Sequence, residues 1–353
     1  MNSPFNANAT RNLLRMNPIF IVGHGLAGAI LAHSLLDKGF KVYCTDAEIN
    51  HSASRVAAGL INPFIGPKLN IPEEFKDCVE TNLRFFRKWE KLYGEKLFKE
   101  ETLLRVFISE HQVIKWKELS DSSEYAKSFV SEKNLNQMGI SGRWGAGETK
   151  SYRLDVGRFI EKSKQLLVSM DSWIKPREAN MILTSKQTTI FAEGYNVANN
   201  PFFNWLPFAP AQGEILELQG PHFPTVSNGT WLLPHCDDKY LSGSTWKHTD
   251  LKSGPTLEGK SEIYRKLKFI PINQFQEVDH LSGIRSGTKD RNPIIGRHPT
   301  YQNLFIFNGF GSRGSTTIKL SADHLINLLI RNIELPSHIN LNRFMEYYRE
   351  ISA

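Results

Sequence analysis

Three glycines near the start of the chain have the spacing of a dinucleotide-binding turn. Gly23, Gly25 and Gly28 follow the short apolar run 19–22 in the pattern G-x-G-x-x-G. The first glycine permits a tight turn, the second lets the backbone approach a pyrophosphate, and the third lets the next helix pack closely. Asp46 follows 23 residues after Gly23, where a carboxylate accepts hydrogen bonds from a ribose. These residues predict a site for NAD or FAD, and a tight turn in an unrelated α/β protein is the alternative.

The elements around these glycines support the prediction. Residues 19–22 read as a strand that is buried on both faces of a parallel sheet. Apolar residues then recur at helical spacing over 27–35, and a second apolar run follows at 40–44. Strand, glycine turn, helix, strand and acid therefore occur in the order of a Rossmann-type unit.

Two further segments favour FAD over a nicotinamide cofactor. Residues 52–66 carry small side chains and glycines, which would let the backbone lie against a broad planar ligand. Ser52 or Ser54 could bind a phosphate there, or could simply cap a helix. Near the other end, the apolar run 304–308 leads into a glycine-rich turn and a helix. The N-terminus of such a helix would stabilise the negative charge that a flavin gains on reduction.

Four motifs in this order resemble the D-amino-acid oxidase superfamily of FAD-dependent oxidoreductases, which includes glycine oxidase and sarcosine oxidase. The motifs are VGHGLAG, SASRVAAGLINP, GIRSGTKDRNPIIG and GFGSRGSTT, and the similarity runs from Pro18 to about Arg331. The last motif is also similar to the oxidase domain of a bifunctional enzyme that modifies the wobble uridine of tRNA. That oxidase removes the carboxymethyl group from carboxymethylaminomethyl-uridine, and we expect only this oxidase step to carry over.

The resemblance implies which residues hold FAD. The expected contacts come from both glycine-rich turns, from the segment after the second strand, and from the glycine at the end of the expected strand in TIFAEGY: Gly23, Gly25, Leu26, Ala27, Gly28, Asp46, Ala47, Ser54, Ala57, Ala58, Gly59, Gly194, Gly311, Ser312, Arg313, Gly314, Ser315 and Thr316. For Arg313 the backbone contact is expected, and its side chain would face either flavin or substrate. No cysteine lies in a flavin-attachment motif, so we expect non-covalent FAD.

Arg285 is the predicted substrate contact. It occupies the place in GIRSGTKDRNPIIG where glycine-oxidase-like proteins carry an arginine that binds the substrate carboxylate. A guanidinium can hold a carboxylate through two parallel hydrogen bonds, and a structural salt bridge with Asp290 is the alternative. Trp246 and His235 are further candidates for the catalytic pocket, although a tryptophan at a strand end can simply pack and a histidine can lie at the surface.

The implied reaction is oxidation of a carbon–nitrogen bond. A hydride equivalent would pass from the substrate to flavin N5, the imine would hydrolyse, and oxygen would reoxidise the flavin to give hydrogen peroxide. Lys289 or Lys68 would assist oxygen by placing positive charge near the flavin. The expected substrate is an N-substituted glycine or a related amine, with carboxymethylaminomethyl-uridine in tRNA as one candidate. The alternatives are a free small molecule such as glycine, sarcosine or a D-amino acid, and a flavin-binding protein without turnover.

The predicted fold is α/β (α+β overall), with a Rossmann-like FAD-binding domain of the glutathione-reductase type and an inserted antiparallel-sheet substrate domain. We expect the FAD-binding domain to comprise 18–69, 140–207 and 280–353, the substrate domain to comprise 70–139 and 208–279, and a disordered tail or leader at 1–17. Residues 70–135 are expected to be mostly helical. Residues 209–246 are expected to form antiparallel strands, with Asp237 and Asp238 at a hairpin turn.

Composition limits the class of protein without naming its function. The 353 residues are 40% hydrophobic and 22% charged, which is an ordinary balance for a globular chain. The net charge of +7 is spread along the chain, so it does not by itself indicate a polyanionic partner. The three cysteines lie far apart, which predicts neither a metal site nor a disulfide framework and suits the cytoplasm. No apolar stretch reaches the roughly 18 residues of a membrane-spanning helix.

Overall fold

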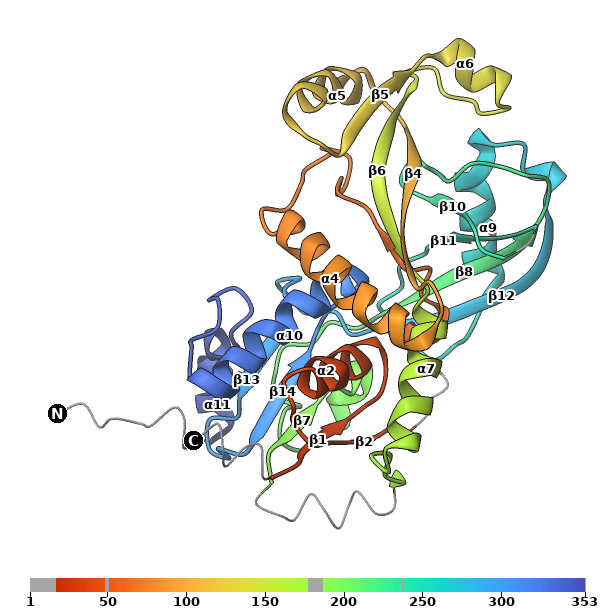
Figure 1. Cartoon of the computed structure of the whole chain (residues 1–353). Coiled ribbons are helices and arrows are strands. Elements are labelled where there is room, and N and C mark those ends of the chain that lie inside the picture. Colours follow the sequence, from red (N-terminus) through yellow and green to blue (C-terminus); the bar gives the residue numbers. More distant parts are fainter. Residues whose placement is uncertain (1–16, 48–50, 177–186, 237, 353) are drawn as a thin grey trace.

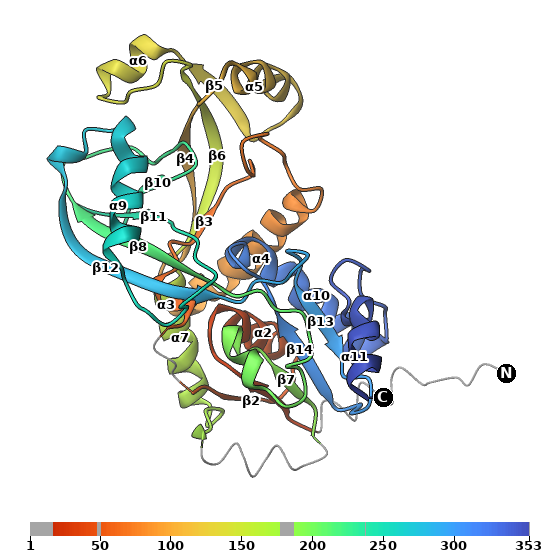
Figure 2. The ribbon, with the colours of Figure 1, turned by 180° about the vertical axis from the view of Figure 1, so that it is seen from behind.

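The computed structural model describes residues 17–47, 51–176, 187–236 and 238–352. The expected tail or leader falls mainly on residues 1–16, which lie outside the described residues. The described chain forms two β-sheets, and Figures 1 and 2 show them at opposite ends of the molecule with helices packed around both.

The smaller sheet is a five-stranded sheet with the order β13-β14-β7-β1-β2. Its strands are β1 (Ile19–Val22), β2 (Val42–Thr45), β7 (Thr189–Phe191), β13 (Ile294–Arg297) and β14 (Leu304–Asn308). β1, β2, β7 and β14 run parallel, whereas β13 pairs with β14 in the antiparallel sense. The carboxyl ends of the parallel strands therefore meet at one edge, where ligands bind in sheets of this kind.

Helices cover the smaller sheet. α2 (Leu26–Leu36) is buried along almost all of its length, because the sheet, α7 (Val156–Ser169) and α10 (Gly314–Arg331) surround it. α10 also packs against α4 (Phe75–Tyr93), which lies farther from the sheet. The hydrophobic core of this part joins the strands to these helices and includes Phe85, Phe86 and Phe159.

The larger sheet is a nine-stranded sheet with the order β12-β8-β11-β10-β9-β4-β6-β3, and β5 pairs with β6. Its strands are β3 (Leu60–Ile61), β4 (Phe98–Val106), β5 (Ala126–Val130), β6 (Ala146–Leu154), β8 (Ala211–Gln219), β9 (Val226–Ser227), β10 (Trp231–Pro234), β11 (Lys239–Gly243) and β12 (Gln276–Arg285). Its strands pair in the antiparallel sense except for β4 with β9, so the sheet is mixed. A second core lies between this sheet and α9 (Leu257–Lys266).

The predicted α/β class with a Rossmann-like sheet and a second sheet is confirmed. The β10–β11 hairpin lies where the sequence predicts it, and Asp237, which was predicted at its turn, lies outside the described residues. The remaining elements are short or peripheral: α3 (Ala53–Val56), α5 (Glu110–Ser122), α6 (Glu132–Gln137), α11 (Met345–Ser352) and four 3-10 turns at Gly194–Asn199, Leu267–Phe269, Ile272–Gln274 and Leu341–Phe344. None of the helices in the described part of the chain combines the length and the apolar character that a membrane span needs.

Residues 70–135 are mostly helical, as predicted, but the strands β4 and β5, which were not predicted, interrupt the helices. α4 ends at Tyr93, and Gly94 takes a left-handed conformation with φ of 67°. The strand β4 then starts at Phe98 and pairs along its whole length with β6. The first half of β4 is charged and reads like the solvated face of a helix, but pairing with a distant strand makes it a strand.

Candidate active site

A cavity of about 1460 Å³ lies between the two sheets and is lined by residues from both. Pockets for drug-sized ligands span about 300–1,000 Å³, so this cavity has room for a dinucleotide and a small substrate together. Its walls come from the β1–α2 turn, residues 52–62, the ends of β7, β8 and β12, and the start of α10.

Backbone contacts require glycine at two positions of the first turn. Gly23 has a φ of 102°, and a Cβ atom there would lie 2.4 Å from the carbonyl oxygen of Ala192. A Cβ atom on Gly28 would lie 1.9 Å from the carbonyl oxygen of Gly23. Neither glycine lines the cavity, and both instead bring the N-terminus of α2 against the end of β1. Gly25, by contrast, lines the cavity and begins α2 without a side-chain cap.

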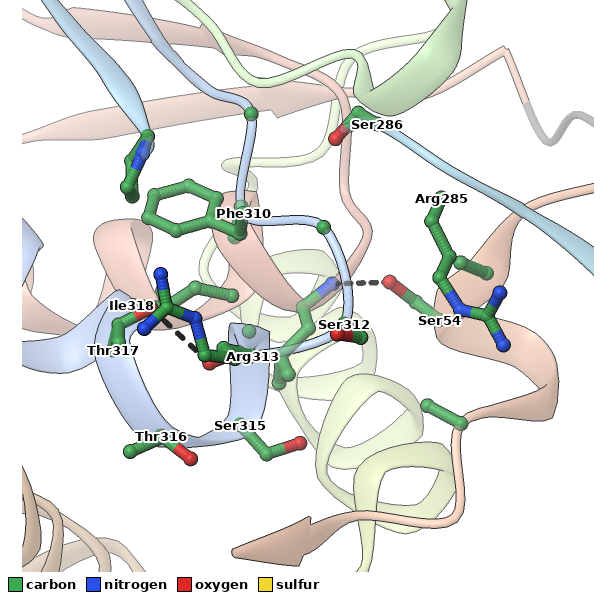
Figure 3. A pocket seen from close by; sticks show the side chains of 18 of the residues that line it. Ser54, Arg285, Ser286, Phe310, Ser312, Arg313, Ser315, Thr316, Thr317 and Ile318 are labelled. Atoms are coloured by element: carbon green, nitrogen blue, oxygen red, sulfur yellow. Dashed lines mark hydrogen bonds between the residues drawn. The ribbon is translucent and has the colours of Figure 1, made fainter. Parts of the chain in front are cut away.

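Ser54 and Asp46 are held against this turn. The Leu26 N–H donates to Ser54 Oγ at 3.0 Å. Figure 3 marks this hydrogen bond of Ser54 with a dashed line. The His24 N–H donates to Asp46 Oδ1 at 3.0 Å. Asp46 lines the cavity, so its carboxylate is positioned beside the glycine turn, as a ribose-binding acid requires.

A buried histidine pair joins the turn to α7: His24 belongs to the turn and lines the cavity, and His33 lies in α2. Sequence reasoning missed this pair. His24 Nε2 lies 2.8 Å from Ser163 Oγ, and that oxygen lies 3.4 Å from His33 Nδ1. The other ring nitrogen of His33 contacts the hydroxyl of Tyr93. Burial lowers the pKa of His24 to about 4 and that of His33 to about 3, so both rings are neutral near pH 7. The signal in the sequence was a histidine placed between two glycines of the motif.

The second glycine-rich turn lines the same cavity as the first. Gly311 has a φ of 56°, and α10 begins at Gly314 without a side-chain cap. Asn82 of α4, which was not predicted, donates to the carbonyl oxygens of Ser315 and Thr316 at 3.3 and 3.0 Å. Ser312 and Arg313 of this turn line the same cavity as Ser54 and Arg285, and Figure 3 labels all four residues.

The Arg313 side chain is turned toward a neighbouring loop. Arg313 Nη2 donates to the carbonyl oxygen of Arg291 at 3.0 Å. The first residues of α10 line the cavity, so the N-terminus of this 18-residue helix faces it with its partial positive charge.

Arg285 lies at the end of β12, on the cavity wall of the larger sheet. Arg285 Nη1 donates to the carbonyl oxygen of Thr245 at 3.1 Å, and Nη2 donates to Ser244 Oγ at 2.8 Å. Burial lowers the pKa of Arg285 to about 10, which still leaves it protonated near pH 7. Within the described part of the chain, no carboxylate pairs with Arg285, and Asp290 instead pairs with Arg343 at 2.8 Å. The salt bridge between Arg285 and Asp290 is therefore not formed.

The other predicted catalytic residues lie in different places. Trp246 lines the cavity, and its ring centre lies 4.4 Å from the guanidinium carbon of Arg285. His235 is not among the lining residues, because it lies at the turn end of the β10–β11 hairpin. It follows Trp231 by four residues, roughly 13 Å along the strand from the cavity. Lys289 lines the cavity, whereas Lys68 does not.

The predicted cofactor residues divide in the same way. Most of them line the cavity: Gly25, Leu26, Ala27, Asp46, Ser54, Ala57, Ala58, Gly59, Gly194, Gly311, Ser312, Arg313, Gly314, Ser315 and Thr316. Gly23, Gly28 and Ala47 are not among the lining residues. The two ends of the chain and the segment after β2 are therefore brought to one site.

Comparisons with known proteins agree with this geometry. Residues 174–328 match the family model described as "DAO: FAD dependent oxidoreductase". The chain is 30% identical to glycine oxidase of Bacillus subtilis over 134 residues, which cover 36% of each protein. It is 22% identical over 349 residues to the tRNA 5-methylaminomethyl-2-thiouridine biosynthesis bifunctional protein MnmC of Marinobacter nauticus. That match covers 88% of this chain and 55% of that protein. The matches thus span between about a third and just over half the length of these two relatives.

Solved structures share the fold. Iminodiacetate oxidase (IdaA) from Chelativorans sp. BNC1 superposes with a TM-score of 0.71 at 19% identity, and the match covers 92% of this chain and 98% of that one. Glycine oxidase from Bacillus cereus superposes with a TM-score of 0.73 at 15% identity, and the match covers 90% of this chain and 96% of that one. With two glycine-rich turns on one cavity and these similarities, the chain is similar to the DAO family of FAD-dependent oxidoreductases and resembles glycine oxidase and the oxidase domain of MnmC.

Proposed function

We propose that this protein is an FAD-dependent oxidase of amines that carry a carboxylate, with N-substituted glycines as the substrate class. Arg285 carries the proposal. A guanidinium has five N–H donors, and Arg285 uses two of them on Thr245 and Ser244. The charge faces the cavity with no paired carboxylate among the described residues. A carboxylate ligand would satisfy the remaining donors and neutralise the charge.

The residues on the cavity wall suit FAD, which we propose is bound without a covalent link. The N-terminus of α2 and Gly25 would receive the pyrophosphate, and Asp46 would accept hydrogen bonds from the ribose. The segment 57–59 and the N-terminus of α10 would flank the flavin. When bound, FAD would supply the redox chemistry, as acceptor of a hydride equivalent from the carbon beside the nitrogen, with oxygen as the final acceptor that is reduced to hydrogen peroxide.

The chain's own part in the reaction is to orient and enclose the substrate. Arg285 would hold the carboxylate, so the adjacent carbon is presented from the wall of the larger sheet toward the α10 turn. Ser244 and Thr245 fix the guanidinium plane and thus the direction in which the carboxylate binds. The imine that results hydrolyses in water without a dedicated acid–base pair.

Two substrate types fit this site. A free amino acid is supported by the similarity to proteins named glycine oxidase and iminodiacetate oxidase. A carboxymethylaminomethyl-uridine in tRNA is supported by the similarity to MnmC over most of this chain. In both cases the smaller sheet with its helices would serve as the FAD-binding domain and the larger sheet as the substrate domain. The three free thiols would suit a reducing compartment.

The test is anaerobic reduction of the bound flavin. The purified protein is loaded with FAD and mixed with glycine, sarcosine, D-alanine, D-proline or tRNA that carries carboxymethylaminomethyl-uridine, and the loss of the flavin band is followed. We expect bleaching by at least one of them, and a loss of about tenfold or more in Arg285→Met. Arg143→Met is the matched control, since Arg143 also stacks on a tryptophan, Trp144, but lies away from the cavity. No bleaching by any amine would overturn the proposal and favour a flavin-binding protein without turnover.

A further inference from the structure

A row of residues with apolar side chains lies beside Arg285 on the same wall of the cavity. Ile215 of β8 is opposite Gly243 of β11, and Gly243 is opposite Trp231 of β10. Residues directly opposite one another on neighbouring strands point to the same face of a sheet. Ile215 and Trp231 both line the cavity, so this row faces it.

Glycine at the centre of the row leaves no side chain between the two apolar residues. A Cβ atom on Gly243 would lie 3.2 Å from Cγ1 of Ile215 and 3.5 Å from Cζ2 of Trp231. The two apolar side chains therefore close over the glycine from both sides. We call Ile215, Gly243 and Trp231 the apolar shelf.

The apolar shelf lies close to Arg285, the proposed carboxylate contact. A Cβ atom on Gly213 would lie 2.0 Å from Nη2 of Arg285, so the guanidinium rests over Gly213. Gly213 and Ile215 are two residues apart on β8, which is roughly 7 Å along a strand. Glycine or sarcosine bound at Arg285 has no group that spans this distance, whereas a ring joined through one carbon to the nitrogen does.

Trp246 adds a second apolar surface at the rim. It stacks on Arg285, lines the cavity and still exposes 55% of its surface. An aromatic side chain of this size is costly to leave in water, and it offers a face or edge for a planar ligand. His248 lies next to it, with ring centres 6.4 Å apart.

We propose that the apolar shelf, with Trp246 at its rim, binds an aromatic or heteroaromatic ring joined through one carbon to the nitrogen of the substrate. This inference rests on the proposed function, because Arg285 must hold the carboxylate for the ring to reach the shelf. It makes N-(arylmethyl)glycines the preferred substrates over glycine and sarcosine. A uracil ring carried on a carboxymethylaminomethyl group has this arrangement, and so does N-benzylglycine.

Binding can be measured apart from turnover with 4-phenylbutanoate, which copies the length and ring of N-benzylglycine but has no amine to oxidise. Its dissociation constant is measured by calorimetry on the FAD-loaded protein, with butanoate for comparison. We expect 4-phenylbutanoate to bind about tenfold or more tightly than butanoate, as burial of a ring against apolar side chains predicts. Trp231→Leu should remove most of this difference and Trp231→Phe should keep most of it. Trp144→Leu should leave it unchanged, because Trp144 does not line the cavity.

Turnover gives the second measurement. We expect N-benzylglycine to reduce the flavin about tenfold faster than sarcosine at low concentration. Trp231→Leu should lower the rate with N-benzylglycine and leave the rate with sarcosine within about threefold of the parent.

The outcomes separate the two proposals. Reduction by sarcosine with no advantage for the ring, in binding or in rate, overturns the apolar shelf and leaves the proposed function standing. Tight 4-phenylbutanoate binding that depends on Trp231, without reduction by any amine, supports the shelf and overturns the oxidase.

Discussion

The guanidinium of Arg285 lies over the α-carbon of Gly213 on the neighbouring strand. A Cβ atom at Gly213 would lie 2.0 Å from Nη2 and 2.3 Å from Cζ of Arg285. Arg285 pairs with Ala211 on β8, so its side chain extends along the sheet to cover the glycine. The Arg285 guanidinium, the proposed carboxylate contact, can thus lie there only because Gly213, two residues after Ala211 on β8, has no side chain.

Gly213→Ala should therefore impair substrate binding more than folding. The added methyl group meets the movable end of the arginine, so the guanidinium shifts and loses its bonds to Ser244 and Thr245. A lost charged hydrogen bond is worth about 1.5–3 kcal/mol, which corresponds to a fall of roughly ten- to a hundredfold in kcat/KM. Steady-state kinetics check this, and FAD content should match the parent protein. An unchanged KM would show that the guanidinium does not hold the carboxylate.

Gly28→Ala should weaken both folding and FAD binding. Its Cβ atom would lie 1.9 Å from the carbonyl oxygen of Gly23, which is backbone and cannot rotate away. Overpacking of this kind costs about 1–3 kcal/mol, and here it also displaces the N-terminus of α2. Urea unfolding and FAD titration check the two effects. Gly157→Ala in α7 is the control: its Cβ atom meets nothing within 4 Å, so stability should stay level or rise by up to about 1 kcal/mol.

Stability should fall as the pH drops below the ordinary pKa of histidine. His24 and His33 have a pKa of 6.5 when unfolded, and burial lowers these values to about 4 and about 3 in the fold. Between pH 6.5 and about 4 the unfolded chain binds protons that the folded protein excludes, so the free energy of unfolding decreases. Each histidine contributes up to about 1.4 kcal/mol per pH unit in that window.

His33→Leu tests this linkage. Denaturant midpoints between about pH 6.5 and pH 5 should depend less steeply on pH in His33→Leu than in the parent, because one titrating group is gone. His111→Gln, at an exposed position, should keep the parent slope. Equal slopes in all three proteins would mean that His33 is charged in the fold.

One cysteine should react in the folded protein. Cys236 is exposed, whereas Cys44 and Cys78 are buried. Burial raises the pKa of Cys78 to about 12 and that of Cys44 further still, so neither forms the reactive thiolate near pH 7. A thiol reagent should modify one group per chain before denaturant is added and all three after it, and Cys236→Ser should remove the fast reaction. Fast modification of a second thiol would show that α4 or β2 opens readily.

The sequence alone was enough for the parts of the site that depend on neighbouring residues. The spacing of Gly23, Gly25 and Gly28, the apolar run before them and Asp46 after them predicted the first strand, turn and helix correctly. The glycine-rich turn before α10 was recognised in the same way. These features are local, because a turn and a helix start are set by the conformations of a few consecutive residues.

The tertiary structure decided which distant residues meet. β4 is a strand because it pairs with β6, although its charged first half resembles a helix. Trp246 reaches the cavity and His235 does not, since strand register places them at opposite ends of the hairpin. Ser244 and Gly213 are both far from Arg285 in sequence, and only the order β12-β8-β11 brings them together. Side chains one strand apart meet through backbone pairing between distant segments, and no local pattern in the chain encodes that register.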